Sequence, residues 1–172
     1  MSTHMRTAFF VISIAFLSQA TLANAATDWT PYLKPMLSGC GFPNPSHKPP
    51  ARYKASILGD KINIGTDNYG MSDYRGDKTT IYTLKEATAF GQRLSKIEYL
   101  AGFEWGHVKL YFKDATFTAL RPQFKLPNSD QLYTDDAAVT KNDASGYDVE
   151  DIGSINLIFD TKEKSITCFS GH

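Results

Sequence analysis

Two cysteines, Cys40 and Cys168, constrain the fold of this chain more than any other feature of its sequence. They are its only cysteines, and 127 residues separate them. An even number of cysteines in an exported chain favours a disulfide over free thiols. A bridge across so long a loop stabilises a fold by about 4–5 kcal/mol at most. The alternative pairs a nucleophilic Cys168 with His172 as its base, but a chain end orients a base poorly. We therefore predict a structural disulfide that ties the first segment of the domain to its last strand.

Residues 1–25 have the pattern of a secretory signal peptide. Arg6 supplies a positive charge, an apolar stretch of ten residues follows at 8–17, and Ala23-Asn24-Ala25 offers a cleavage site. A stretch of this length is too short to cross a bilayer as a helix, which takes about 20 apolar residues. No cysteine stands where a lipid anchor would be attached. The sequence thus predicts a periplasmic protein without a membrane span, cleaved near Ala25, with residues 26–172 as a single globular domain.

The charge balance argues against nucleic acid as a partner. The chain has 18 Lys and Arg against 18 Asp and Glu, which gives a formal net charge of +0. Removal of the signal peptide takes away Arg6 and leaves one net negative charge. A protein that binds nucleic acid or an anionic membrane normally presents a basic face, and this composition does not predict one.

Apolar residues near the mature N-terminus recur at the spacing of one helical face. They are Trp29, Tyr32, Leu33, Met36 and Leu37. Thr30 and Pro31 suit the N-cap and the first helical position, whereas Pro35 removes an internal hydrogen bond. We expect one short or kinked helix that faces the core.

Most of the remaining chain has the periodicity of strands. Val108, Leu110 and Phe112 alternate with polar residues, so one face of this strand is buried and the other is wet. The pair Gly59-Asp60 predicts a hairpin turn, and residues 85–92 are compatible with a turn of helix that ends at Gly91. The expected strands cover residues 57–58, 62–64, 79–84, 94–100, 107–113, 116–120, 154–159 and 165–169. The sequence therefore predicts an α+β fold, mainly β: an antiparallel sheet of hairpins in a meander, with the helix held to the last strand by the disulfide.

The only cluster that resembles a reaction centre is Glu104, Trp105 and His107. An E-x-x-H pair binds metal on a helix, where residues three apart share a face. Gly102 and Gly106 flank this cluster, and its neighbours have strand periodicity, in which residues three apart face opposite ways. The zinc-peptidase pattern H-E-x-x-H is absent. We predict an exposed hairpin tip used for contact, with no metal.

The segment 122–153 is polar and acidic and is expected to be a loop. Its candidate binding residues are Asp135, Asp136, Asp143, Asp148 and Glu150. An EF-hand alignment on Gly146 places Lys141 and Ile152 at ligand positions, and neither can coordinate calcium there. Three interpretations remain: a solvated loop, an acidic patch for a cationic partner, and a calcium site of another type.

No motif for a reaction stands out elsewhere in the chain. The sequence lacks G-x-S-x-G, glycine-rich phosphate loops and spaced metal ligands. A paired acid and base remains open in any chain with this many carboxylates. We therefore expect a protein that binds rather than catalyses and that needs no cofactor, with a hydrolase that lacks a short motif as the alternative.

The layout of the mature chain resembles small periplasmic proteins of Gram-negative bacteria that have no assigned reaction. The resemblance rests on three groups of residues: Trp29, Tyr32, Leu33 and Cys40; Ala89, Phe90 and Gly91; Ile166, Thr167 and Cys168. Some of these proteins are immunity proteins that block an incoming toxin, such as a type VI secretion effector. The resemblance implies a protein partner, either a toxin or an envelope enzyme. Because aromatic tips also bind glycans, peptidoglycan is the alternative ligand.

Overall fold

A computed structural model describes residues 25–43, 48–66 and 70–171 of the chain. The predicted signal peptide lies outside the described residues, apart from Ala25 at its end. None of the helices in the described ranges is long and apolar enough to cross a membrane.

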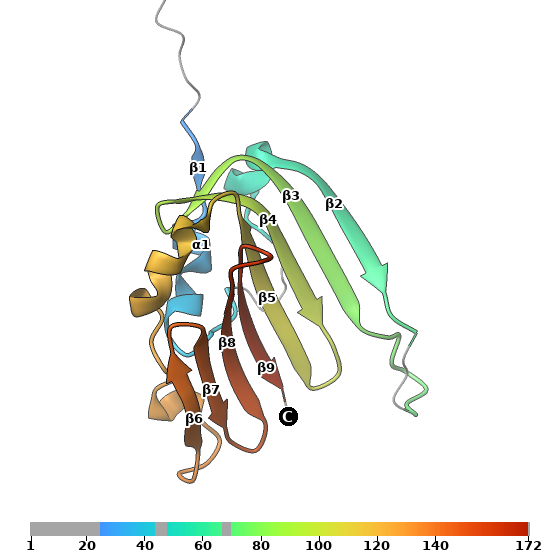
Figure 1. Cartoon of the computed structure of the whole chain (residues 1–172). Coiled ribbons are helices and arrows are strands. Elements are labelled where there is room, and N and C mark those ends of the chain that lie inside the picture. Colours follow the sequence, from blue (N-terminus) through green and yellow to red (C-terminus); the bar gives the residue numbers. More distant parts are fainter. Residues whose placement is uncertain (1–24, 44–47, 67–69, 172) are drawn as a thin grey trace, which may run out of the picture.

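One nine-stranded sheet dominates the molecule (Figure 1). Its strands are β1 (Thr27–Asp28), β2 (Ile57–Ile64), β3 (Lys78–Ala89), β4 (Gln92–Ala101), β5 (Trp105–Phe112), β6 (Ala138–Asp143), β7 (Gly146–Glu150), β8 (Ser154–Asp160) and β9 (Ser165–Gly171). Strands β2 to β5 form one antiparallel meander and β6 to β9 a second, and β5 pairs with β9 to join them. Only the short β1 pairs in parallel, with the end of β3. The predicted mainly β, antiparallel fold is confirmed.

Short helices cover one face of this sheet, which we call the inner face. They are α1 (Thr30–Leu33), η1 (Lys34–Leu37), η2 (Ala51–Ser56), η3 (Ala115–Gln123) and η4 (Ser129–Gln131). The predicted N-terminal helix is confirmed as short, because one α-turn ends where Pro35 enters a tighter 3₁₀ turn. Trp29, Leu33 and Met36 are fully buried against the sheet.

The predicted disulfide is confirmed and joins this helical layer to the sheet. Cys40 follows η1, and Cys168 lies in β9 with its Cα 5.0 Å from that of Cys40. Cys168 is paired in register with Val108 on β5 and with Leu157 on β8, and all three are fully buried. Because directly opposed residues of a sheet share a face, the bridge sits in the centre of the inner-face core.

Two of the predicted turns differ from the structure. Gly59-Asp60 is no hairpin, because β2 runs through it and pairs along its length with the 12-residue β3. The glycine marks a shift of register between Ile57 and Gly59, which is a bulge. The expected helical turn at 85–92 is also wrong, since β3 continues to Ala89. The chain reverses at Phe90-Gly91, where both residues have positive φ, as a two-residue hairpin turn requires.

Two further segments differ from their predictions. Residues 116–120 form part of the 3₁₀ helix η3 rather than a strand, and the apolar pair that is buried there, Phe117 and Leu120, is three residues apart. The expected loop at 122–153 contains the hairpin β6–β7. Tyr147 and Val149 are buried in it at the two-residue period of a strand, a signal hidden by the surrounding acidic residues.

We expect the disulfide to supply much of the stability of the fold. Replacing both cysteines by alanine should lower the free energy of unfolding by about 4 kcal/mol, because the unfolded chain regains the freedom of a long loop. Urea denaturation of the variant and the parent protein measures the difference. Adding a reductant should shift the denaturation midpoint of the parent only. A parent midpoint that is insensitive to reductant would contradict this prediction.

Gly146, at the start of β7, should tolerate no side chain. Its φ is +139°, and a Cβ added there would lie 1.7 Å from the Leu157 carbonyl oxygen. Gly146→Ala should therefore destabilise the protein by about 3 kcal/mol in thermal or urea unfolding. Gly59→Ala is the matched control, because an added Cβ meets nothing within 4 Å. Equal losses in the two variants would show that the close approach at Gly146 is unimportant.

Candidate binding site

The predicted hairpin tip is a turn between β4 and β5, but only one of its three candidate residues lies at the tip. Glu104 is exposed in the turn with a φ of +59°. Trp105 begins β5 and is half-buried, since its indole lies over Gly102 and its ring centroid is 6.1 Å from that of Phe169. His107 lies further along the strand.

The register places four of the predicted site residues on the face of the sheet opposite the helices, the outer face. One row across this face contains His107 on β5, Phe169 on β9, Asn156 on β8 and Asp148 on β7. The next row begins at Trp105 and ends at Glu150. Glu104, Asp135 and Asp136 lie in turns or loops outside these rows, and Asp143 is the last residue of β6.

A closed polar network surrounds His107. Its Nε2 lies 3.0 Å from a Glu98 carboxylate oxygen, and the Tyr111 hydroxyl donates to the other oxygen at 3.2 Å. A carboxylate only accepts, so Nε2 carries the proton. The hydrogen bond from His107 holds the pKa of Glu98 below its usual range, although partial burial opposes the shift. The Lys96 ammonium is 3.5 Å from the centroid of the Tyr111 ring. The two carboxylate oxygens of Glu98 thus each have a donor in this network.

The acidic candidates do not converge on one point. Asp143 accepts hydrogen bonds from the backbone and side chain of Ser145 in the β6–β7 turn, and these lower its pKa. Asp148 accepts one from the Asn156 amide at 2.9 Å. Within the described ranges, no group of three or more His, Cys, Asp or Glu side chains could hold a metal ion.

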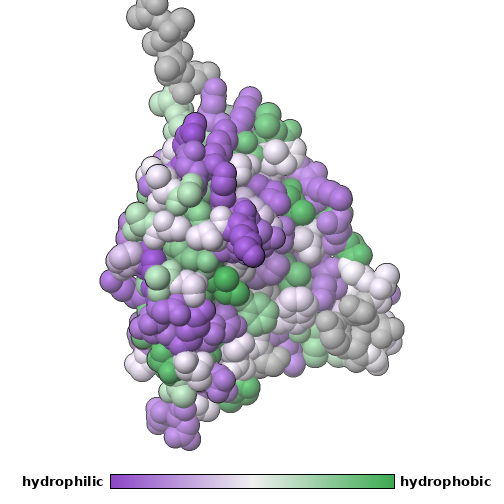
Figure 2. Space-filling model, in the orientation of Figure 1, coloured by the Kyte–Doolittle hydropathy of each residue, from purple (hydrophilic) through white to green (hydrophobic). Residues whose placement is uncertain are grey.

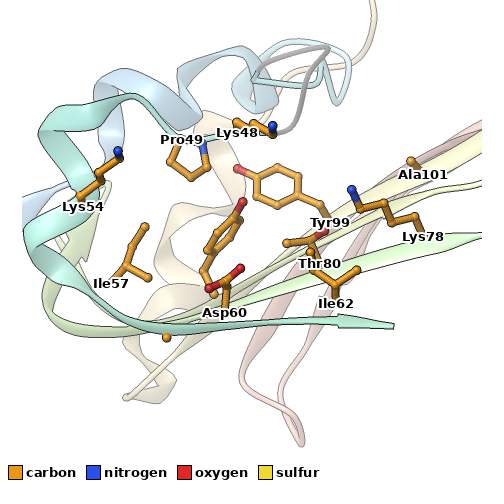
Figure 3. A pocket seen from close by; sticks show the side chains of 12 residues that line it. Lys48, Pro49, Lys54, Ile57, Asp60, Ile62, Lys78, Thr80, Tyr99 and Ala101 are labelled. Atoms are coloured by element: carbon orange, nitrogen blue, oxygen red, sulfur yellow. The ribbon is translucent and has the colours of Figure 1, made fainter. Parts of the chain in front are cut away.

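A cavity of about 530 Å³ lies on the inner face, beside β2, β3 and β4. We call it the tyrosine cavity and define it by Tyr82, Tyr99, Ile57, Ile62, Lys54 and Lys78. Figure 3 shows these strands as one wall and Lys48 with Pro49 on the opposite side. None of the residues predicted to form a site from the sequence lines it.

The cavity exists because the helical layer is narrower than the sheet. Ile62, Thr80, Tyr99, Val108 and Cys168 are successive partners in one row of the inner face. The residues of this row at β9, β5 and β4 are buried under the N-terminal segment and its disulfide. At the β2 end no segment of the described ranges packs as tightly, and Ile62 is 51% exposed.

The floor of the cavity is aromatic and uncharged. Tyr99 is buried and its ring lies 6.0 Å, edge to face, from that of Tyr82. Burial raises the pKa of Tyr99 strongly, with a further contribution from Tyr32. Burial and the nearby Asp60 also raise the pKa of Tyr82. Both phenols therefore stay neutral and remain hydrogen-bond donors at all physiological pH values.

A second, shallower hollow of about 370 Å³ lies beside Trp105. Its lining consists of Trp105 and Phe169 with Gly153, Ser154 and Gly171. The two aromatic side chains and the small residues around them leave an open, weakly polar surface at one end of the outer face. Two of the predicted binding residues thus line a hollow, Trp105 here and Asp135 in a smaller one of about 200 Å³ beside Tyr133.

Hydrophilic residues cover much of the molecular surface seen in Figure 2, with small hydrophobic patches between them.

Two concave regions stand out as candidate binding sites, and the tyrosine cavity is the deeper one. The sequence contains no signal for the polar members of the tyrosine cavity, because Thr80 and Tyr82 are residue types that are common in any strand. The charges of Lys54 and Lys78 gave no such signal, since exposed lysines are common.

No protein-family model matches this chain, and neither a curated protein nor a solved structure matches it significantly.

Proposed function

We propose that this protein resides in the periplasm, binds its ligand in the tyrosine cavity and catalyses no reaction. The observation that carries the proposal is the cavity itself. Its volume of about 530 Å³ falls within the range of roughly 300–1,000 Å³ typical of small-molecule sites. Aromatic and aliphatic side chains with a few polar groups line it, which is the usual composition of such sites.

The chemistry of the remaining candidates supports binding over catalysis. Both cysteines are joined in the disulfide, so neither is a free nucleophile. Within the described residues, the His107 side chain hydrogen-bonds to a carboxylate and to no hydroxyl. A hydroxyl nucleophile that is activated by a base needs a hydrogen bond to that base. The disulfide also agrees with an oxidising compartment such as the periplasm.

We expect the tyrosine cavity to bind a neutral apolar probe. N-phenyl-1-naphthylamine should gain fluorescence saturably on mixing with the protein, because the cavity shields it from water. Ile62→Glu should weaken this binding about fivefold, since the variant replaces apolar lining with a charge. Ile62 is largely exposed, so the variant should still fold.

Asn63→Glu provides the matched control on the next residue of β2, whose side chain points to the other face of the sheet. It should leave the affinity for the probe unchanged. If the probe fails to bind, or if both variants weaken it equally, the tyrosine cavity is not a binding site.

The hollow beside Trp105 supports a second candidate function, which is contact with the sugars of peptidoglycan. An indole paired with Phe169 and bordered by glycines offers a flat surface for a sugar ring. The immunity or inhibitor role implied by the resemblance stays a prediction.

Trp105→Ala tests this second function. Because the indole is half-buried, we expect a stability loss of about 1–2 kcal/mol, below the 3–5 kcal/mol typical of a fully buried tryptophan. Binding to soluble peptidoglycan fragments, measured by calorimetry, should fall about tenfold. Tyr133→Ala, at an exposed aromatic residue that does not line the hollow, should bind normally. Unchanged binding in Trp105→Ala would exclude the hollow as a glycan site.

A further inference from the structure

We infer that the tyrosine cavity takes a free single-chain amphiphile with an anionic head group, a carboxylate or a phosphate, and holds that group at the Lys78 end. The inference rests on the proposed function, since it names the ligand class of the same cavity. Three features carry it: the shape of the cavity, its charge, and the distribution of polar groups along it.

The cavity is elongated along β2. Its lining includes both Ile57 and Ile62 on this strand, which at about 3.3 Å per residue spans roughly 16 Å. The rings of Tyr82 and Tyr99 lie beside this strip on the neighbouring strands. A flexible apolar chain fits such a strip better than a compact polar molecule does, because it would cover the exposed side chain of Ile62 along with the tyrosine rings.

The lining has a positive net charge although the chain as a whole is neutral. Three lysines and one aspartate line the cavity, which gives a net charge of +2. Within the described residues, Lys54 and Lys78 have no carboxylate partner. Unpaired cations at the rim of an apolar cavity attract an anionic ligand and repel a cationic one.

The Lys78 end is the better place for the head group. Lys78 is paired with Ile64, four residues along β2 from Asp60, so the carboxylate of Asp60 lies about 13 Å away along the strand. Thr80 is two residues further on and shares the inner face with Lys78. Its hydroxyl makes no hydrogen bond to another described residue. An ammonium and a hydroxyl can thus both donate to one carboxylate or phosphate.

Asp60 determines the orientation of an amphiphile in the cavity. It is paired with Tyr82 in the middle of the strip, and Figure 3 shows its side chain between Lys54 and Lys78. A head group placed beside this carboxylate would be repelled. The apolar chain of the ligand therefore lies across the middle of the cavity, and the anionic group lies at its end.

Displacement of N-phenyl-1-naphthylamine by four amphiphiles of equal chain length tests the inference. The probes are decanoate, decyl phosphate, decanol and decyltrimethylammonium, all used below the concentrations at which they form micelles. We expect the two anions to bind at least fivefold more tightly than decanol, and the cation most weakly. Added salt should weaken the binding of the anions and leave that of decanol unchanged.

Charge variants locate the head group. Lys78→Gln should weaken decanoate about fivefold and leave decanol unchanged. Lys54→Gln should have a smaller effect, and Asp60→Asn should tighten decanoate. Lys61→Gln is the matched control, because it removes the same charge from β2 on the face opposite the cavity.

The outcomes separate this inference from the proposed function. If the neutral probe binds but the four amphiphiles bind equally, or the cation binds best, the anionic class is wrong and the binding function stands. Equal effects of Lys78→Gln and Lys61→Gln would overturn the placement of the head group. Binding to phosphatidylglycerol vesicles without binding to monomeric decanoate would replace the free amphiphile with a membrane lipid. If neither the probe nor any amphiphile binds, both proposals fail.

Discussion

The disulfide between Cys40 and Cys168 determines which part of the sheet the helical layer covers. The bridge pins the N-terminal segment over the middle of the inner face, where Cys168 lies between Val108 and Leu157. Two backbone hydrogen bonds join the same segment to Lys125, just after η3: the Gly39 N–H donates to the Lys125 carbonyl, and the Lys125 N–H donates to the Leu37 carbonyl. The helical layer is thus held over the central strands and cannot slide toward β2. The part of the inner face near β2 that the helical layer leaves uncovered forms the tyrosine cavity.

The two faces of the sheet satisfy different physical requirements. The inner face buries its apolar side chains under helices, and Phe117 stacks on Phe112 at 5.4 Å as part of that core. Among the described residues no helix lies over the outer face, and polar pairs stabilise it, such as His107 with Glu98 on the neighbouring strand and Lys109 with Glu163 in the β8–β9 turn. Such partly exposed pairs contribute little stability individually. They keep polar side chains on the uncovered face and help to fix the pairing register of its strands.

The period of two in the sequence predicted the faces of the strands but not the limits of the helical layer. Val108, Leu110 and Phe112 are buried as their alternation indicates, and the same rule holds for Ile155, Leu157 and Phe159. Gly59-Asp60 misled the prediction because a glycine marks a bulge as readily as a turn, and only the length of β3 decides between them. The tyrosine cavity could not be predicted, since Tyr82 and Tyr99 follow the same alternation as core residues. Which of them meets a helix depends on tertiary contacts.

Charged residues in the edge strand β2 explain how this protein tolerates an open apolar strip there. Leu58, Ile62 and Ile64 are all more than half exposed, and a long edge strand of this kind invites pairing with another chain. Asp60 and Lys61 stand in its middle on opposite faces, where charges discourage such pairing. An amphiphile in the cavity would cover Ile62 and add to that protection. A site at this edge therefore uses apolar surface that the short helices of the described residues leave uncovered on a sheet of this width.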